Sequence, residues 1–187
     1  MRRLSRVVTS VTSVVSLAVL AGCGGSPPEA APAPTPSPPT ETATPEPAAP
    51  TPPAGLSTKS ESGAKATVAY FLASMAFAGD SGDVSNFRQT FTDECTKCEA
   101  IARGIERTYK SGGYIRGGAW KPSYLKFYSI QGDIAYIDAG VAYSPQEYKP
   151  KAGSPTQKAP GGQRVLKAFQ LRWIAGEWRV GALDPEA

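Results

Sequence analysis

With 187 residues, 41% of them hydrophobic, the chain is long enough to form one globular domain. It contains no histidine, which excludes Ser-His-Asp and Cys-His catalysis and removes a ligand that most catalytic zinc sites need. The formal charge of +4 reflects 20 Lys and Arg against 16 Asp and Glu. Three of the 20 lie in an N-terminal segment that we expect to be removed, which leaves 17 against 16 and gives no indication of nucleic-acid binding.

The first 22 residues have the order of a secretory signal peptide. Arg2, Arg3 and Arg6 form a positive flank, and a short apolar stretch over residues 7–19 follows. A membrane-spanning helix needs about 20 apolar residues, so this stretch is too short to cross a bilayer comfortably. We therefore interpret residues 1–22 as a cleaved signal.

The signal ends in Leu20-Ala21-Gly22-Cys23, which resembles a bacterial lipobox. In proteins with this motif the cysteine thiol is diacylglycerated and the signal is cut just before it. The resemblance implies acyl chains such as palmitate on Cys23 and a location on the extracytoplasmic side of the cell membrane. Two acyl chains would anchor the chain stably, whereas one binds only marginally. The alternative is an ordinary signal peptide that happens to contain a cysteine.

Residues 23–63 read as a disordered tether. Twelve of the 18 prolines lie between Pro27 and Pro53, among Ala, Thr, Ser and Glu. Such a segment has too little apolar surface to offset the entropy of ordering it. Extended as polyproline II, it would hold the domain up to about 100 Å from the membrane.

The remaining residues, 64–187, predict one domain that begins with helices. Apolar residues at helical spacing predict a first helix, which starts near Thr58 and stops at Gly79. Asp83 is a candidate N-cap for a short second helix, and Thr92 or Asp93 for a third. The apolar face of the first helix consists of Val68, Phe71, Leu72, Met75 and Ala78.

Strands follow over 120–130 and 134–143, joined by a turn at 131–133. A polar loop is expected over 144–162, and then a strand that closes in a hairpin at Ala175-Gly176. Helices followed by an antiparallel meander predict an α+β fold, with the helices packed on one face of about four strands. One face of the penultimate strand is expected to hold Val165, Phe169, Leu171 and Trp173.

This order of elements resembles the cone-shaped nuclear-transport-factor-2-like fold. The lipobox, the Pro/Thr tether, Ala78-Gly79-Asp80, Cys95-Thr96-Lys97-Cys98, Gly112-Gly113 and Gly117-Gly118 together resemble an actinobacterial lipoprotein family whose domain has no assigned function. The resemblance implies a fold and a location but no catalytic residues. Homodimers through the sheet are common among proteins of this fold type, so a homodimer is an open alternative.

Cys95 and Cys98 are the two cysteines that remain if Cys23 is lipidated. An even pair in an exported domain predicts a disulfide. A thiol redox pair is the alternative, because a helix start lowers a thiol pKa. Redox pairs of this spacing usually follow a strand, however, so we favour a bond that joins the second helix to the third.

Tyr136 and Asp138 share the less apolar face of the strand over 134–143 and are candidates for a pocket. A carboxylate beside a tyrosine could perform acid–base chemistry there. The alternative is that Asp138 is paired or solvated, since no second catalytic group is identifiable by spacing. Four cations in and beside the long loop could contact anionic polymers or headgroups, although a solvated loop is the simpler interpretation: Lys149, Lys151, Lys158 and Arg164.

The sequence therefore favours a membrane-anchored, non-catalytic binding or interaction module for a wall component, small ligand or envelope protein. It predicts no cofactor, no metal and no nucleic-acid partner. The alternatives are a small-molecule enzyme that uses Asp138, and a thiol redox protein that uses Cys95 and Cys98.

The lipobox generates the first testable prediction. Cys23→Ser should move the protein from the membrane fraction to the soluble fraction, because the acyl chains have no attachment point without the thiol. Detergent phase partitioning measures this directly. Unchanged partitioning of the variant would refute the lipid anchor.

Overall fold

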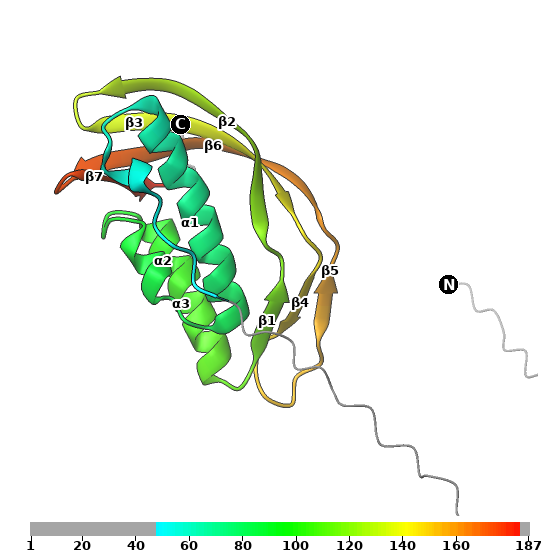
Figure 1. The fold of residues 1–187 in the computed structure, drawn as a ribbon. Coiled ribbons are helices and arrows are strands. Elements are labelled where there is room, and N and C mark those ends of the chain that lie inside the picture. Colours follow the sequence, from blue (N-terminus) through cyan, green and yellow to red (C-terminus); the bar gives the residue numbers. More distant parts are fainter. Residues whose placement is uncertain (1–47, 184–187) are drawn as a thin grey trace, which may run out of the picture. The chain divides into compact units, whose positions relative to one another are not determined.

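The computed structural model describes residues 48–183 (Figure 1). The predicted signal peptide, Cys23 and the tether up to residue 47 lie outside this range. Within it, no helix combines the length and the apolar character needed to cross a membrane.

The described part is an α+β domain with a four-stranded antiparallel sheet, as the sequence predicted, and it also has a second, three-stranded antiparallel sheet that the sequence did not predict. The larger sheet has the strand order β2-β3-β6-β7, and the smaller has the order β1-β4-β5. The helices are η1 (Ala54–Ser57), α1 (Glu61–Ser81), α2 (Ser85–Gln89) and α3 (Thr96–Lys110). The strands are β1 (Tyr114–Gly117), β2 (Trp120–Gln131), β3 (Ile134–Tyr143), β4 (Gln146–Lys149), β5 (Gln157–Ala159), β6 (Gly162–Ile174) and β7 (Glu177–Ala182).

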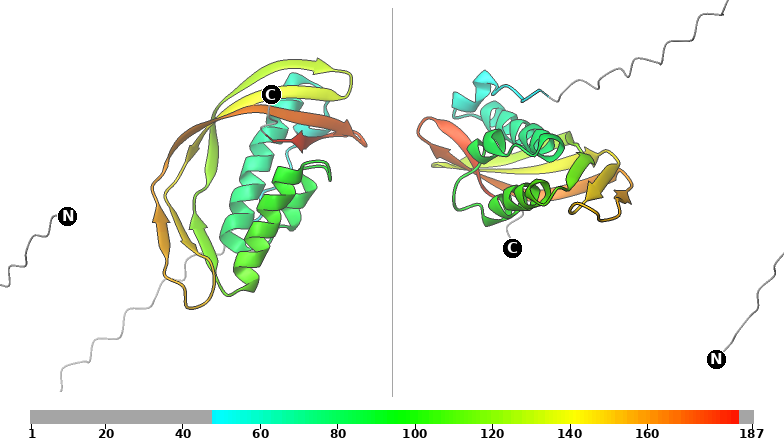
Figure 2. Two further views of the ribbon diagram at one scale, coloured as in Figure 1. Left: turned by 180° about the vertical axis from the view of Figure 1, so that it is seen from behind. Right: turned by 90° about the horizontal axis from the view of Figure 1, so that it is seen from below.

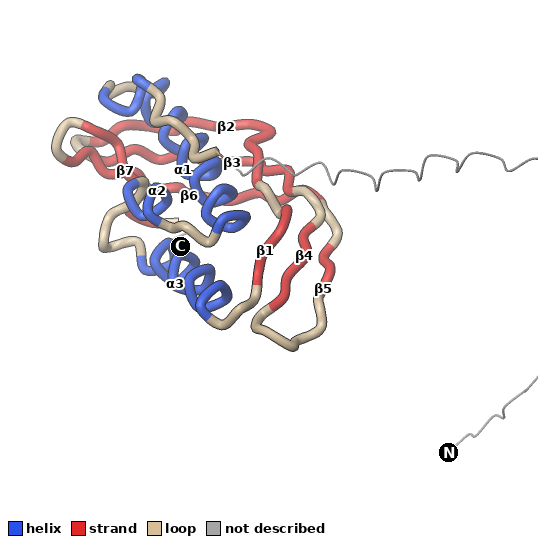
Figure 3. Tube along the Cα trace, turned by 60° about the horizontal axis from the view of Figure 1, so that its bottom comes forward, coloured by secondary structure: helices blue, strands red, loops and turns tan. Residues whose placement is uncertain are grey.

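The long strands curve around the helices. Figures 1 and 2 show β2, β3 and β6 arching over α1, with the smaller sheet continuing toward the C-terminal end of α3. In Figure 3 the three helices lie together on one side of the strands. This curved sheet over helices is the cone-like arrangement that the resemblance implied.

The first helix starts and ends at different residues from those expected. Ser60 caps it, because its side chain accepts a hydrogen bond from the Gly63 backbone N–H at 3.1 Å. Gly82, not Gly79, ends it in a left-handed conformation with φ of 80°. The folded part also begins before residue 64, since the indole of Trp178 donates a hydrogen bond to the Thr58 carbonyl at 3.1 Å.

The core forms where the aromatic side chains of three elements meet. The Phe71 ring of α1 lies 5.1 Å from Phe87 of α2 and 5.8 Å from Phe169 of β6, measured between centroids. All three side chains are fully buried, and burying each stabilises the fold by roughly 1.5–3 kcal/mol. The sheet contributes the buried residues of β3, in the predicted alternation: Ala135, Ile137, Ala139 and Val141.

The predicted alternation of β6 is wrong at Val165, because the strand contains a bulge. Ile137 and Ala139 of β3 pair with Phe169 and Leu166, so β6 carries one extra residue between them. Val165 therefore lies on the outer face and is 52% exposed, instead of sharing the inner face with Phe169. Arg164, opposite buried Val141, turns to the inner face.

The expected loop over 144–162 contains two short strands. β4 pairs with both β1 and β5, and Tyr148 of β4 stands opposite Ile115. These strands were not predicted from the sequence, because the segment is polar and contains prolines. The pairing of β4 and β5 satisfies backbone groups without burying a clear apolar face, so no hydrophobic alternation marks them.

An ion-pair cluster joins α2 to α3. The Arg88 guanidinium donates to Glu106 at 2.7 Å and to Glu99 at 3.0 Å, with a second hydrogen bond to each carboxylate. These hydrogen bonds hold the pKa of both carboxyl groups below their usual value. All three side chains are about a third exposed, so solvent screens the cluster.

The depressed pKa values predict a pH-dependent contribution from Arg88. A carboxyl group whose folded pKa is lowered stabilises the fold above the unfolded pKa, near 4.5, and this contribution is lost as pH falls through the folded value. The destabilisation caused by Arg88→Met should therefore be largest at neutral pH and should shrink below pH 4.5. Thermal unfolding across pH measures it. Arg103→Met is the control, because Arg103 meets Glu99 only at 3.6 Å and is 60% exposed; parallel pH profiles for R88M and wild type would contradict the prediction.

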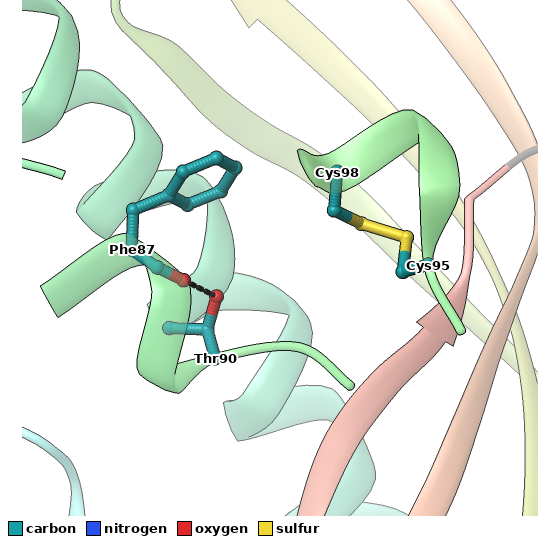
Figure 4. Close-up of a disulfide and its surroundings, with 4 residues drawn as sticks. All are labelled: Phe87, Thr90, Cys95 and Cys98. Atoms are coloured by element: carbon teal, nitrogen blue, oxygen red, sulfur yellow. Dashed lines mark hydrogen bonds between the residues drawn. A yellow bond between two sulfur atoms is a disulfide. The ribbon is translucent and has the colours of Figure 1, made fainter. Parts of the chain in front are cut away.

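Cys95 and Cys98 form a disulfide at the start of α3 (Figure 4). Cys95 is the N-cap residue of this helix, so the bond closes its first turn and does not join it to α2 as expected. Thr92 and Asp93 precede the cap. The two cysteines are 1% and 0% exposed and belong to the core.

Replacing both cysteines by Ser should lower the free energy of unfolding by about 2 kcal/mol, the contribution that loop entropy assigns to so short a closed loop. Chemical denaturation measures the loss, and far-ultraviolet circular dichroism should show the fold retained. The native bond should also resist mild reductant, since thiol exchange needs access to a sulfur atom. Complete unfolding of the double variant would show that the bond does more than close one turn.

Candidate functional site

A cavity of the described domain lies between the helices and the sheets. This main cavity has a volume of about 510 Å³, within the range of roughly 300–1,000 Å³ found for small-molecule sites. Leu72 and Met75 of α1 and Ile101 and Ile105 of α3 form its helical wall. Its strand-side wall includes Ile115, Trp120 and Leu166. Apolar side chains thus cover most of the surface.

The space exists because α1 changes character along its length. Phe71 reaches across to β6 and closes the interior at one end of the cavity. One and two turns further along, α1 presents Ala76 and Gly79 to the cavity. Ala76 fills little of this space, whereas Gly79 lies close to β1, since a Cβ added to it would lie 3.9 Å from the Ile115 side chain.

Tyr109 holds the walls of this region together. Its hydroxyl lies 2.8 Å from the Gly79 carbonyl of α1 and 3.1 Å from the Ile115 carbonyl of β1. Burial raises the pKa of this phenol, so the proton needed for these hydrogen bonds stays bound. The Tyr109 ring also packs against Gly82, where an added Cβ would lie 2.6 Å from the ring. The end of α1, α3 and β1 are therefore fixed relative to one another.

Gly117 and Gly118 form a corner of the main cavity between β1 and β2. Both take positive φ angles, 69° and 71°, which glycine adopts without strain. The Gly117 N–H donates to the Asp80 carboxylate at 2.8 Å. A Cβ on Gly118 would lie 2.3 Å from the Gln146 amide nitrogen, so this glycine makes room for the Gln146 side chain in the cavity wall.

The polar residues of the main cavity are few and carry no negative charge. Lys97 of α3, Gln146 of β4 and Arg164 of β6 line it. Among its described lining residues there is no carboxylate, hydroxyl or thiol. The arrangement can bind an apolar molecule and orient a polar end, but it offers no carboxylate or imidazole for proton transfer.

A second, side cavity of about 390 Å³ adjoins the first. It shares four lining residues with the main cavity: Gly118, Trp120, Gln146 and Arg164. Tyr143 and Ser144 complete its polar wall, and the Tyr143 ring lies 6.0 Å from that of Trp120. Arg164 and Gln146 therefore stand where the apolar and polar spaces meet.

The structure places Tyr136 and Asp138 away from both cavities, on the face of β3 opposite the buried residues. Tyr128 donates a hydrogen bond to the Asp138 carboxylate at 2.6 Å, and Gln170 donates to the Tyr136 hydroxyl at 3.3 Å. The hydrogen bond to Asp138 raises the pKa of Tyr128 above its usual value near 10. This makes Tyr128 a weaker acid, whereas an acid–base catalyst needs a pKa near the working pH. The expected pocket position of Tyr136 and Asp138 is thus corrected, because strand alternation turns them outward.

The disulfide and the titratable groups add no reactive centre to the site. Both sulfur atoms belong to buried residues, which limits attack by another thiolate. In residues 48–183, no three His, Cys, Asp or Glu side chains gather in a way that could hold a metal ion.

Arg164 lines both cavities, whereas the sequence pattern placed it among the cations in and beside the expected loop. It was grouped with the loop cations Lys149, Lys151 and Lys158, and Lys158 does pair with Glu147 at 2.8 Å. Arg164 lies two residues before Leu166 and therefore shares its face of β6. This position indicates an inward-facing Arg164 only if the bulge between residues 166 and 169 is known.

Comparison with solved structures finds similar folds at low identity. A protein assigned as the β subunit of an aromatic-ring-hydroxylating dioxygenase from Novosphingobium aromaticivorans is 12% identical, with a TM-score of 0.42 over 64% of this chain and 86% of that chain. The Kfla4162 protein from Kribbella flavida is 14% identical, with a TM-score of 0.41 over 64% and 87%. At these values the resemblance gives no functional assignment.

Comparison with curated protein sequences finds no match. A family model, described as a family of unknown function (DUF6318), matches residues 34–183. This range includes every helix and strand of the domain and the second half of the proline-rich segment. The chain therefore belongs to the DUF6318 family.

Proposed function

We propose that this protein is a non-catalytic binding module of the cell envelope, anchored to the membrane through acyl chains on Cys23, which holds a small apolar ligand in the main cavity. The single observation that carries the binding role is an apolar cavity of about 510 Å³ between α1, α3 and the strands. The apolar lining of an open cavity contacts water, and a bound apolar ligand would remove that surface from water, which is favourable.

The lining chemistry supports binding over turnover. Lys97, Gln146 and Arg164 are its polar members, and the carboxylate candidate Asp138 lies on the other face of the sheet. The lipobox ending at Cys23 and the proline-rich segment after it support an anchored domain held away from the bilayer.

A saturable binding measurement tests the proposal. The mature chain from residue 23, carrying Cys23→Ser, has neither the apolar signal segment nor an acyl anchor to compete as apolar surface, and it is titrated with the neutral probe N-phenyl-1-naphthylamine. We expect one probe per chain, with enhanced probe fluorescence and quenching of Trp120, because Trp120 lines the cavity. Absence of saturable binding would overturn the proposal.

Filling the cavity should abolish this binding. Ala100 of α3 lines the main cavity, so Ala100→Phe places a ring in the space that the probe would occupy. We expect affinity to fall by at least about tenfold, which corresponds to roughly 1.4 kcal/mol. Arg103→Phe is the matched control, because it adds the same ring to an exposed position of the same helix outside the cavity lining. Equal affinities of A100F and R103F would place the probe elsewhere.

A further inference from the structure

The position of Arg164 indicates what kind of ligand the cavities accept. Its place after the β6 bulge puts it on the inner face, opposite Val141, and at the junction of the main and side cavities. No ion pair of Arg164 occurs among the residues that the structure describes. A guanidinium there presents several N–H donors to whatever occupies the junction.

The charged residues that line the two cavities are cations. Lys97 adds a second cation to the main cavity, and neither cavity has an Asp or Glu among its described lining residues. Arg164 and Lys97 are both exposed, so solvent screens part of their field, but the sign of that field still selects the charge of the ligand. An anionic group is therefore favoured at this end, and a cationic group is disfavoured.

The side cavity supplies further hydrogen-bond donors next to Arg164. The Ser144 hydroxyl oxygen accepts a hydrogen bond from the Ala119 N–H at 3.1 Å, which leaves the hydroxyl proton available for a second acceptor. The Gln146 side chain, held against Gly118, contributes an amide at the boundary of both cavities. Donors of this kind suit the oxygen atoms of a carboxylate or phosphate.

We infer that the ligand is an amphiphile with one alkyl chain and an anionic head group. The chain occupies the main cavity and the head group lies in the side cavity against Arg164, with the Ser144 and Gln146 side chains beside it. This inference rests on the proposed function and adds the polarity of the ligand to it. Carboxylate and phosphate heads share the chemistry that Arg164 recognises, through paired N–H···O hydrogen bonds.

Competition against N-phenyl-1-naphthylamine on the Cys23→Ser chain tests the inference with three ligands of equal chain length. Dodecanoate and dodecyl phosphate should displace the probe at concentrations at least about tenfold below dodecanol, a factor that corresponds to roughly 1.4 kcal/mol. A stronger effect of one anion identifies a carboxylate or a phosphate as the preferred head group. Equal displacement by all three would overturn the inference while leaving the proposed function intact. Failure of the probe itself to bind would instead overturn the proposed function.

Arg164→Gln should remove the preference for the anions and leave the displacement by dodecanol unchanged. Lys158→Gln is the matched control, since it removes one positive charge from neighbouring β5 at a residue that lines neither cavity. An unchanged anion preference in R164Q would overturn the inference.

Salt provides a measurement that needs no Arg164 variant. Increasing ionic strength should weaken the displacement of the probe by dodecanoate and leave the displacement by dodecanol unchanged. Salt-independent displacement by dodecanoate would equally contradict the head-group site.

Discussion

The packing of Phe71 is the contact on which the rest of the domain depends. This one side chain of α1 meets Phe87 of α2 and Phe169 of β6, so it joins the helical layer internally and ties it to the curved sheet. Aromatic rings bury large areas and prefer the tilted or edge-on contacts seen here. Figure 1 shows the larger sheet curving around α1, the helix that carries Phe71.

The same helix explains why the domain has an interior space. The large side chain of Phe71 fills the distance to β6, whereas Ala76, further along, fills little of it and Gly79 lies close to Ile115 of β1. Tyr109 then prevents collapse, since its hydroxyl fixes the end of α1 and the start of β1 at hydrogen-bond distance. A rigid frame with small residues on one wall produces a preformed cavity, which binds without the cost of reorganising the protein.

One extra residue in β6 links the fold to the chemistry of the site. Before the bulge, Arg164 and Leu166 face inward, and after it Phe169 and Leu171 do so. Simple alternation from Phe169 would have put Val165 on the inner face and Arg164 on the outer face. The bulge thus exchanges an apolar residue for a cation at the cavity junction, in keeping with the tendency of bulges to redirect side chains beside functional sites.

Local pattern in the sequence determined the three α-helices, the four strands of the larger sheet, the bounds of β3 and the pairing of Cys95 with Cys98, because periodicity and spacing act over a few residues. The expected signal peptide and the resemblance to a lipobox also rest on local patterns, and they predict an address without reference to the fold. Three features became apparent only from the tertiary structure. These are the short strands β4 and β5, the position of Asp138 on the outer face of the sheet, and the cavity. Strand register and a bulge depend on partners far apart in the chain, so no local pattern could place Arg164 beside Gln146.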